Sequence, residues 1–462
     1  MNSFDENINK YYPYLWVILF FISYLIFYPE NWMITDAYNY VNRGIAFSEG
    51  QSNWVITDFL TEESINLIPA PYNTGTSFFF AIFMTLLSKK ALFLVPLFQV
   101  VLSVYLLSVT IKKNNQSQSA LALLGLSLAL MFFSRSAMSC MPSFLLISIT
   151  CYLFFRSEIH WKSAFGLGFL AAFGFWFRES NVFLIAPFVL YCLYENVKLL
   201  PSILLGFILG LGPKIIADLL VYDTWWFSSA SSGFSIYSII DHLPEYGIIL
   251  IVLIPLSILF IGLYKGKGDR TIKVGSLAFI LLYLVYNYTA VEFSGLLKGS
   301  FLTSRFMIPL LPIVVMCAAN LIKEYELFRK VFKVFVVLSL IVIPASQFIF
   351  HKMYASHEQA AKELEKTVKE KDIFVDLSGY TNIIRYFNPL TSEFDHISSI
   401  QNLKSKDFLV DNQLVILTRS RSSEEKSMRA DSLINLVRHL PLSLTKSIEI
   451  DDQNWIEVYK RE

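Results

Sequence analysis

The sequence predicts a polytopic α-helical membrane protein with a small soluble α/β domain at its C-terminal end. Hydrophobic residues make up 55% of the 462 positions, charged residues only 16%, and Phe alone occurs 41 times. A soluble surface needs roughly a quarter of its residues charged. In contrast, 33 of the 108 residues from Ala355 to Glu462 are Asp, Glu, Lys or Arg. The chain is therefore expected to divide into a membrane region, 1–351, and a soluble domain, 352–462.

Charge and cysteine content exclude two further classes. The formal net charge of +1 argues against a nucleic-acid partner held by bulk electrostatics. The four cysteines lie in apolar runs and are expected to be small core residues, with no CxxC pair and no disulfide framework.

Eleven apolar runs approach the roughly 17–25 residues that cross a hydrocarbon core. They are 12–29, 91–111, 119–134, 140–155, 163–177, 181–197, 199–221, 246–264, 272–290, 306–322 and 331–350. The run Thr74–Leu87 is shorter, and its length does not decide whether it crosses.

The distribution of basic residues decides how this short run is placed. If 74–87 does not cross and the N-terminus is cytoplasmic, the inner loops hold fourteen Lys and Arg and the outer loops seven. If it crosses, the bias reverses. We therefore expect a re-entrant helix 74–87, a long first outer loop 30–73 and an extracytoplasmic C-terminal domain. The expected location is the cell's inner membrane.

The outer loops gather unusual residues at the membrane boundary. Arg135, Arg178 and Arg305 all fall on this side, against the positive-inside trend. Such groups are usually functional, although snorkelling to the interface is the alternative. Sugar transfer from a polyprenyl-phosphate donor needs a base for the acceptor hydroxyl and cations at the departing phosphate. A first-loop carboxylate with interfacial arginines suits that chemistry.

The run Thr35–Ala46 (TDAYNYVNRGIA), directly after the first apolar run, is similar to the first-loop acidic signature of GT-C glycosyltransferases. The chain resembles in particular the bacterial relatives of protein O-mannosyltransferases and aminoarabinose transferases. Ala70–Gly75 followed by Phe78–Leu87 is similar to a Tyr/Pro-rich element that leads a short outer helix. Further similar elements are Ser134–Ala137, Phe177–Ser180, Leu220–Trp225 and Ser304–Pro312. The resemblance covers about residues 12–320.

This resemblance implies roles for individual residues. Asp36 would be the catalytic base, and Arg178, Arg305 and Arg135 would bind the donor phosphate. The implied substrate-binding residues are Tyr40, Arg43, Tyr72, Glu179, Asp223 and Lys298. The implied partners are a polyprenyl-phosphate sugar donor, membrane lipid, and an envelope glycan, lipid or protein as acceptor. No metal and no cofactor are expected, since a D-x-D motif is absent and the lipid-linked sugar is a substrate.

The sequence also departs from the family pattern and leaves alternatives open. Asp36 is followed by Ala where relatives have paired acids, and Pro71 precedes Tyr72 instead of following it. Asp36 could instead cap a helix over 37–47. Glu179 could be the salt-bridge partner of Arg178.

Residues outside the family elements also carry predictions. Lys214 and Asp218 are expected to pair through their helical spacing. In the C-terminal domain, strands are expected over 372–377, 414–418, 442–450 and 455–459, and helices over 356–371 and 423–439.

Three other function classes compete with a transferase. A transporter or flippase of lipid-linked saccharides is expected to have a pair of broken helices at matching positions in its two halves, and the sequence shows no such pair. A polymerase or ligase would place its large outer loop late in the chain, whereas here the first loop is longest. An inactive GT-C relative that serves as a scaffold is the third.

Overall fold

The computed structural model describes residues 3–29, 35–51, 55–58, 63–66, 72–155, 159–228, 233–288 and 295–367, with C-terminal stretches 374–376, 397–398, 414–420, 442–451 and 454–461. The chain forms two compact units. Unit 1 comprises Met1–Tyr28, Pro71–Phe80 and Ala91–Ile349, and unit 2 comprises Pro29–Ala70, Ala81–Lys90 and Phe350–Glu462. Unit 2 therefore contains much of the first outer loop in addition to the predicted soluble domain.

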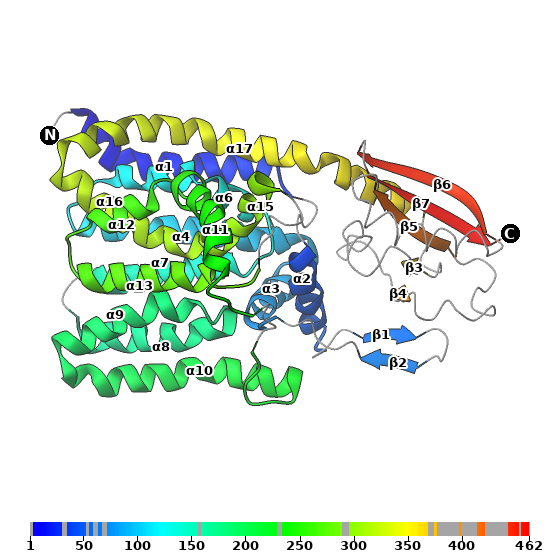
Figure 1. The fold of residues 1–462 in the computed structure, drawn as a ribbon, viewed down its shortest axis with the longest axis horizontal. Helices are drawn as coiled ribbons and strands as arrows, with labels where there is room; N and C mark the ends of the chain where they lie inside the picture. Colours follow the sequence, from blue (N-terminus) through cyan, green and yellow to red (C-terminus); the bar gives the residue numbers. More distant parts are fainter. Residues whose placement is uncertain are drawn as a thin grey trace. The chain divides into compact units, whose positions relative to one another are not determined.

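Unit 1 is a bundle of helices (Figure 1). Its α-helices are α1 (Ser3–Ile26), α4 (Leu94–Lys113), α5 (Ala122–Leu126), α6 (Leu128–Phe133), α7 (Cys140–Phe155), α8 (Trp161–Phe177), α9 (Asn181–Glu195), α10 (Leu200–Tyr222), α11 (Ser238–Ile248), α12 (Ser257–Leu263), α13 (Asp269–Leu284), α15 (Leu296–Thr303), α16 (Leu311–Glu324) and the first part of α17 (Glu326–Thr367). Helices α7 and α16 bury most of their residues and form the centre. Helices α1 and α17 lie side by side, with the hydroxyls of Tyr12 and Ser339 2.7 Å apart.

Shorter helical turns connect these elements. They are the 3-10 helices η1 (Lys89–Phe93), η2 (Gln118–Leu121), η3 (Val197–Leu199), η5 (Ser304–Phe306) and η6 (Ile308–Leu310), and the π-helix η4 (Ile249–Leu253). The short helix α3 (Gly75–Leu86) confirms the helix expected over 74–87, and its 12 residues are too few to cross a bilayer.

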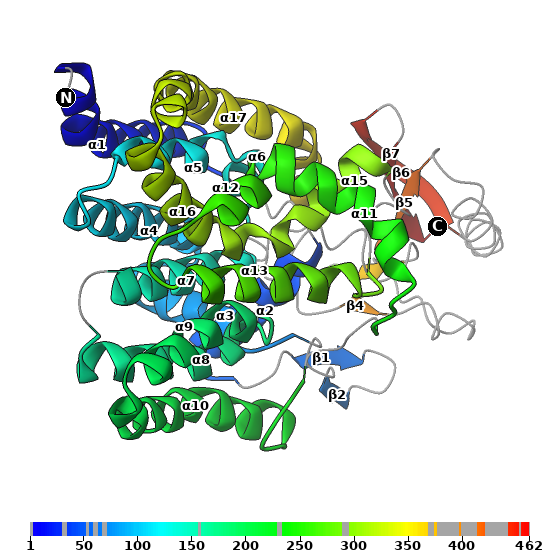
Figure 2. The ribbon, with the colours of Figure 1, turned by 60° about the vertical axis from the view of Figure 1, so that its left-hand side comes forward.

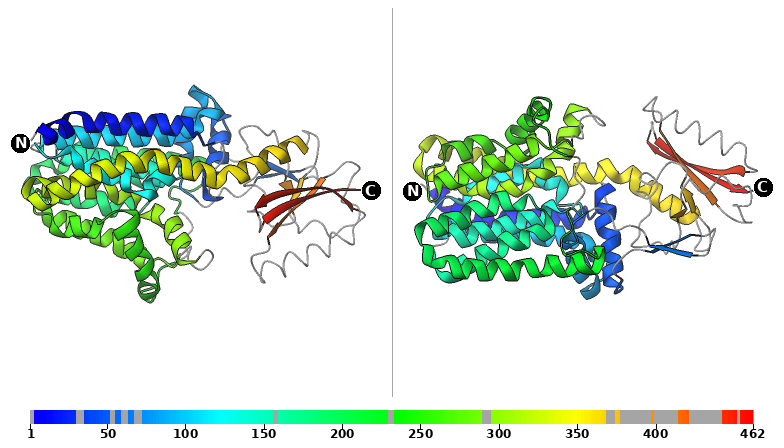
Figure 3. Two further views of the ribbon diagram at one scale, coloured as in Figure 1. Left: turned by 90° about the horizontal axis from the view of Figure 1, so that it is seen from above. Right: turned by 60° about the horizontal axis from the view of Figure 1, so that its bottom comes forward.

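Three described helical segments are long and apolar enough to cross a membrane: Ala91–Lys113, Val197–Tyr222 and Glu326–Ala355. Two bent pairs raise the number to five. Ser238–Leu253 and Ser257–Leu263 meet at 80°, and Leu296–Phe306 and Ile308–Glu324 meet at 54°. Figures 2 and 3 show α11 turned away from the common direction of the bundle. The total of about eleven spans stays a prediction.

One of the predicted runs, 119–134, is not a continuous helix. It consists of η2, α5 and α6, and the break lies at Ser127, which is extended. The Ser127 hydroxyl accepts from the Leu130 amide and donates to the Leu253 carbonyl at 2.9 Å. A serine side chain that binds backbone groups in this way competes with helix formation.

The buried stripe of α10 explains how it packs. Its buried residues recur every three or four positions: Ile203, Gly206, Gly210, Lys214, Asp218 and Val221. The opposite face is exposed and apolar, as expected for a helix that faces lipid on one side. A Cβ at Gly206 or Gly210 would clash with the carbonyl oxygens of Phe165 and Phe169 on α8. Glycine therefore allows these two backbones to approach closely.

This interface predicts a position-dependent effect of alanine on α10. Gly206→Ala is expected to destabilise the folded protein by about 1–3 kcal/mol, because the added methyl overpacks against the α8 backbone. Gly212→Ala is the control, since a Cβ there would meet nothing within 4 Å and alanine is the better helix former. Unfolding in detergent measures both. Equal stability of the two variants would contradict the close approach.

Unit 2 contains α2 (Thr35–Ser48), the hairpin β1 (Val55–Asp58) and β2 (Glu63–Asn66), and a five-stranded sheet. The sheet has the order β4-β3-β5-β7-β6. Its strands are β3 (Phe374–Asp376), β4 (Ile397–Ser398), β5 (Leu414–Ser420), β6 (Leu442–Asp451) and β7 (Asn454–Arg461). β3 pairs in parallel with β4 and β5, whereas β7 pairs antiparallel with β5 and β6. All four predicted strands are confirmed, and the helix predicted over 423–439 lies outside the described residues.

The predicted start of a new helix at Ser356 is wrong. Helix α17 runs without interruption from Glu326 to Thr367. Its last turns are tied to the sheet, because Lys446 of β6 donates to Glu363 at 3.1 Å. Hydrogen bonds from Lys366 and Lys446 lower the pKa of the Glu363 carboxyl.

Candidate active site

Two of the predicted phosphate-binding residues come together in unit 1. Arg178 follows the last residue of α8 in extended conformation, and Arg305 lies in η5 between α15 and α16. Although they are 127 residues apart, the Arg178 Nη1 donates to the Arg305 carbonyl oxygen at 3.3 Å. The convergence expected from their placement in outer loops is therefore present.

The ring of Phe306 holds both guanidinium groups. The Cζ atoms of Arg178 and Arg305 each lie 5.0 Å from its centroid. Tyr283 stacks on Phe306 at 4.8 Å, and Tyr288 accepts a hydrogen bond from Arg305 Nη2 at 3.3 Å. Cation–π contacts stabilise each cation at the ring. Two guanidinium groups at one ring bring two positive charges to this part of the site, which suits an anionic ligand.

Arg135 occupies a different environment from the other two arginines. It has no exposed surface, and its Nη1 donates to Gln347 Oε1 of α17 at 2.7 Å. Its guanidinium also lies 6.0 Å from the ring centre of Tyr24. Because the Arg135 side chain is fully buried and bound to Gln347, a phosphate could reach it only if the surrounding residues moved. The geometry therefore gives its predicted role no support.

A buried ion pair on α10 forms the second polar cluster. Lys214 and Asp218 are 2.8 Å apart, with side chains 0% and 1% exposed, which confirms the predicted pairing. Lys214 Nζ also donates to the Phe227 carbonyl at 2.7 Å and to Asn73 Oδ1 at 3.5 Å. Asp218 Oδ2 accepts from the Phe227 amide at 2.9 Å. Trp226 lies over the ammonium group at 4.7 Å.

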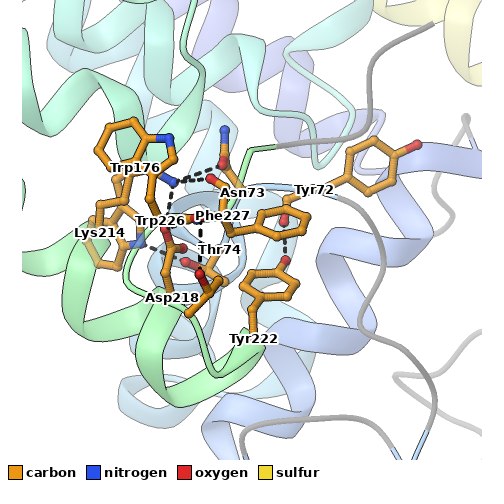
Figure 4. A network of polar contacts seen from close by, with 10 residues as sticks. Tyr72, Asn73, Thr74, Trp176, Lys214, Asp218, Tyr222, Trp226 and Phe227 are labelled. Carbon is orange, nitrogen blue, oxygen red and sulfur yellow. Dashed lines mark hydrogen bonds and ion pairs between the residues drawn. The ribbon is translucent and has the colours of Figure 1, made fainter.

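This cluster contacts residues 72–74, the segment that directly precedes α3 (Figure 4). The Tyr222 hydroxyl donates to the Tyr72 carbonyl at 2.6 Å, and Trp176 Nε1 donates to Thr74 Oγ1 at 2.8 Å. A Cβ at Gly75 would lie 2.5 Å from the Trp176 carbonyl oxygen, so the segment is close to the end of α8. Arg178 is two residues beyond Trp176. The segment and the arginine pair are thus built on the same end of α8.

The remaining predicted residues occupy varied positions. Glu179 is half-buried, Asp223 is exposed and in left-handed conformation (φ 55°) at the end of α10, and Lys298 is exposed on α15. Arg178 donates to the Arg305 carbonyl, and a salt bridge between Arg178 and Glu179 stays a prediction.

The predicted first-loop residues belong to α2 in unit 2. Asp36 is the second residue of α2, so it lies in the first turn and not at a cap before Ala37. Tyr40 and Arg43 are each only 5% exposed. Their roles toward a substrate stay predictions.

Sequence reasoning missed Tyr222, Trp176 and Asn73 as parts of the site. A Lys and an Asp four residues apart inside an apolar run were the available signal, because ionisable groups inside membrane helices mark functional sites. Within the described ranges, no three His, Cys, Asp or Glu side chains could hold a metal ion.

Comparison with protein-family profiles and with curated proteins finds no match to this chain. Two solved structures of ArnT from Cupriavidus metallidurans are similar to it. The structure bound to undecaprenyl phosphate has a TM-score of 0.56 at 10% identity, and the apo structure has a TM-score of 0.58 at 9% identity. Each comparison covers 96% of this chain and 97% of ArnT. The predicted resemblance to the aminoarabinose transferases and other GT-C enzymes is confirmed at the level of the fold: the chain has the fold of ArnT.

Proposed function

We propose that the chain is an integral membrane glycosyltransferase that transfers a sugar from a polyprenyl-phosphate-linked donor to an acceptor hydroxyl. The observation that carries the proposal is the convergence of Arg178 and Arg305 on Phe306. The similarity to ArnT supports it, because one ArnT structure is bound to undecaprenyl phosphate.

The arginine pair suits stabilisation of the leaving group, the polyprenyl phosphate. When the glycosidic bond breaks, negative charge develops on the polyprenyl phosphate. Guanidinium groups offer several N–H donors in a planar array and bind phosphate more strongly than neutral donors. Donors that are already positioned stabilise charge as it develops, which lowers the barrier.

Asp36 is proposed as the general base that accepts the proton of the acceptor hydroxyl. Its support comes from its place in the first-loop signature, at the start of α2. We place the reaction on the outer face of the inner membrane, with the N-terminus cytoplasmic and the C-terminal domain extracytoplasmic. The fourteen-to-seven distribution of basic residues supports this orientation.

Arg178→Gln and Arg305→Gln are each expected to weaken binding of undecaprenyl phosphate about 10- to 100-fold. Each change removes charge-assisted hydrogen bonds worth roughly 1.5–3 kcal/mol. Native mass spectrometry of the purified protein, titrated with undecaprenyl phosphate, measures the affinity.

Arg329→Gln is the matched control. Arg329 loses the same charge, but it lies at the start of α17, where its guanidinium donates to the Lys323 carbonyl in an exposed contact. Its affinity for undecaprenyl phosphate should equal that of the wild type. The proposal fails if all three variants bind the lipid as well as the wild type, or if all three lose affinity equally.

A further inference from the structure

We propose that Tyr222 and the Lys214–Asp218 pair are positioning residues that hold the backbone at Tyr72 and thereby orient its side chain. The inference rests on the proposed function in one respect only, namely that Tyr72 contacts a substrate. The contacts that carry it all lie within unit 1.

The segment that these residues hold, 72–74, forms no helix or strand before α3 begins at Gly75. Nevertheless Asn73 is 3% exposed and Thr74 is fully buried. An irregular segment that is buried must have its polar groups satisfied by neighbouring elements. Here the partners come from α8 and α10, through Trp176, Lys214 and Tyr222.

A continuous chain of contacts runs from the ion pair to Tyr72. Lys214 binds the carbonyl of Phe227 and Asp218 binds its amide, so both backbone polar groups of that residue are held. The ring of Phe227 stacks on Tyr222, with centroids 3.7 Å apart and planes 6° apart. Tyr222 is thereby oriented to donate its hydroxyl to the Tyr72 carbonyl at 2.6 Å.

The side chain of Tyr72 is not itself part of this chain of contacts. Figure 4 shows its carbonyl directed at Tyr222 and its phenol ring pointing away from Lys214 and Asp218. Tyr72 is half-buried. The network therefore acts on the Tyr72 backbone, and a held backbone fixes the Cα–Cβ bond from which the phenol projects.

Stability alone does not account for an ion pair at this place. Desolvating two charges is costly, and apolar residues of similar volume often stabilise a buried site equally well. Of the six buried residues of α10, four are apolar or glycine and pack the helix. Lys214 and Asp218 are the two that reach backbone groups outside it, at Phe227. This fits a role in fixing one conformation.

Tyr222→Phe tests the inference, because it removes only the hydroxyl that holds Tyr72. The matched control is Tyr264→Phe, since the Tyr264 hydroxyl likewise donates to a backbone carbonyl, that of Lys267, at 3.0 Å. The first readout needs no enzymatic activity. A thiol introduced by Tyr72→Cys is labelled with a maleimide, over a low background because the four native cysteines are buried.

Combining Tyr72→Cys with Tyr222→Phe is expected to change the labelling rate by roughly fivefold, because the loss of one hydrogen bond shifts an equilibrium by about that factor. Combining it with Tyr264→Phe should leave the rate unchanged. An unchanged rate with Tyr222→Phe overturns the inference. So does an equal change with Tyr264→Phe, because the effect would then be general loosening.

Sugar transfer supplies the second readout. Tyr222→Phe is expected to raise KM for the donor about fivefold with a smaller change in kcat, and to add nothing to the defect of Tyr72→Ala. Additive defects would show that Tyr222 does not act through Tyr72, and would overturn the inference. If labelling changes as expected while the wild type transfers no sugar, the positioning role stands and the proposed function fails.

Discussion

Asp36→Asn is expected to lower the rate of sugar transfer by a factor of about 10²–10⁴, the usual contribution of a general base. Asparagine has nearly the same shape as aspartate but cannot accept the proton of an acceptor hydroxyl. The initial rate of sugar transfer is measured in membranes that contain each variant at matched levels. Polyprenyl-linked sugars extracted from the same cells serve as donors. Binding of undecaprenyl phosphate should change little, because Arg178 and Arg305 remain.

The control for this change is Asp58→Asn. Asp58 lies in the same first outer loop as the last residue of β1, where it pairs with Glu63 of β2. This variant should transfer sugar at the wild-type rate. A wild-type rate for Asp36→Asn would remove Asp36 as the base, and an equal loss in both variants would point to damage of the loop as a whole.

Lys214→Met is expected to destabilise the folded protein by about 3–5 kcal/mol. It leaves the Asp218 carboxylate buried without its counter-charge, and an uncompensated buried charge is strongly unfavourable. The double variant Lys214→Met/Asp218→Leu removes both charges and is expected to recover most of the lost stability. Unfolding in detergent, followed by circular dichroism, measures all three proteins.

A second lysine–aspartate pair in the chain provides the control. Lys273 and Asp269 are 2.7 Å apart on α13, also four residues apart, but their side chains are 35% and 34% exposed. Lys273→Met should cost less than about 1 kcal/mol, as for other solvent-screened pairs. If Lys214→Met costs no more than Lys273→Met, or if the double variant is no more stable than the single one, burial does not determine the strength of the pair.

Composition and charge placement predict the fold class and part of the site. Apolar runs locate α4, α7, α8, α9 and α10 within a few residues, because lipid-facing and core-facing residues are both hydrophobic. The convergence of Arg178 and Arg305 was likewise predictable, since Arg178 directly follows one apolar run and Arg305 directly precedes another, both on the same predicted side. Hydrophobicity cannot distinguish a straight helix from a broken one. For this reason the break at Ser127 and the 80° bend between α11 and α12 were missed.

The parts of the site that could not be predicted depend on contacts between segments that are distant in the sequence. Lys214 and Asp218 are paired by their spacing along one helix, and that pairing is visible in the sequence. Their bonds to Phe227 and the bond from Tyr222 to Tyr72 depend on how a loop folds back on α10 and on how far apart α8 and α10 lie. Gly206 and Gly210 set this distance through their packing against α8. Glycine is frequent in membrane helices, so the sequence alone does not distinguish these two contact positions from Gly212, where a Cβ would meet nothing within 4 Å.

The most direct test of the proposed transferase is a comparison of envelope glycolipids and glycoproteins by mass spectrometry in three strains. In one the chain is deleted, in one the wild type is restored, and in one Asp36→Asn is restored at the same level. We expect one sugar to disappear on deletion and to return only with the wild type, and its mass to identify the sugar class. Full restoration by Asp36→Asn, or an envelope unchanged by deletion, would contradict a transferase that uses Asp36 as its base.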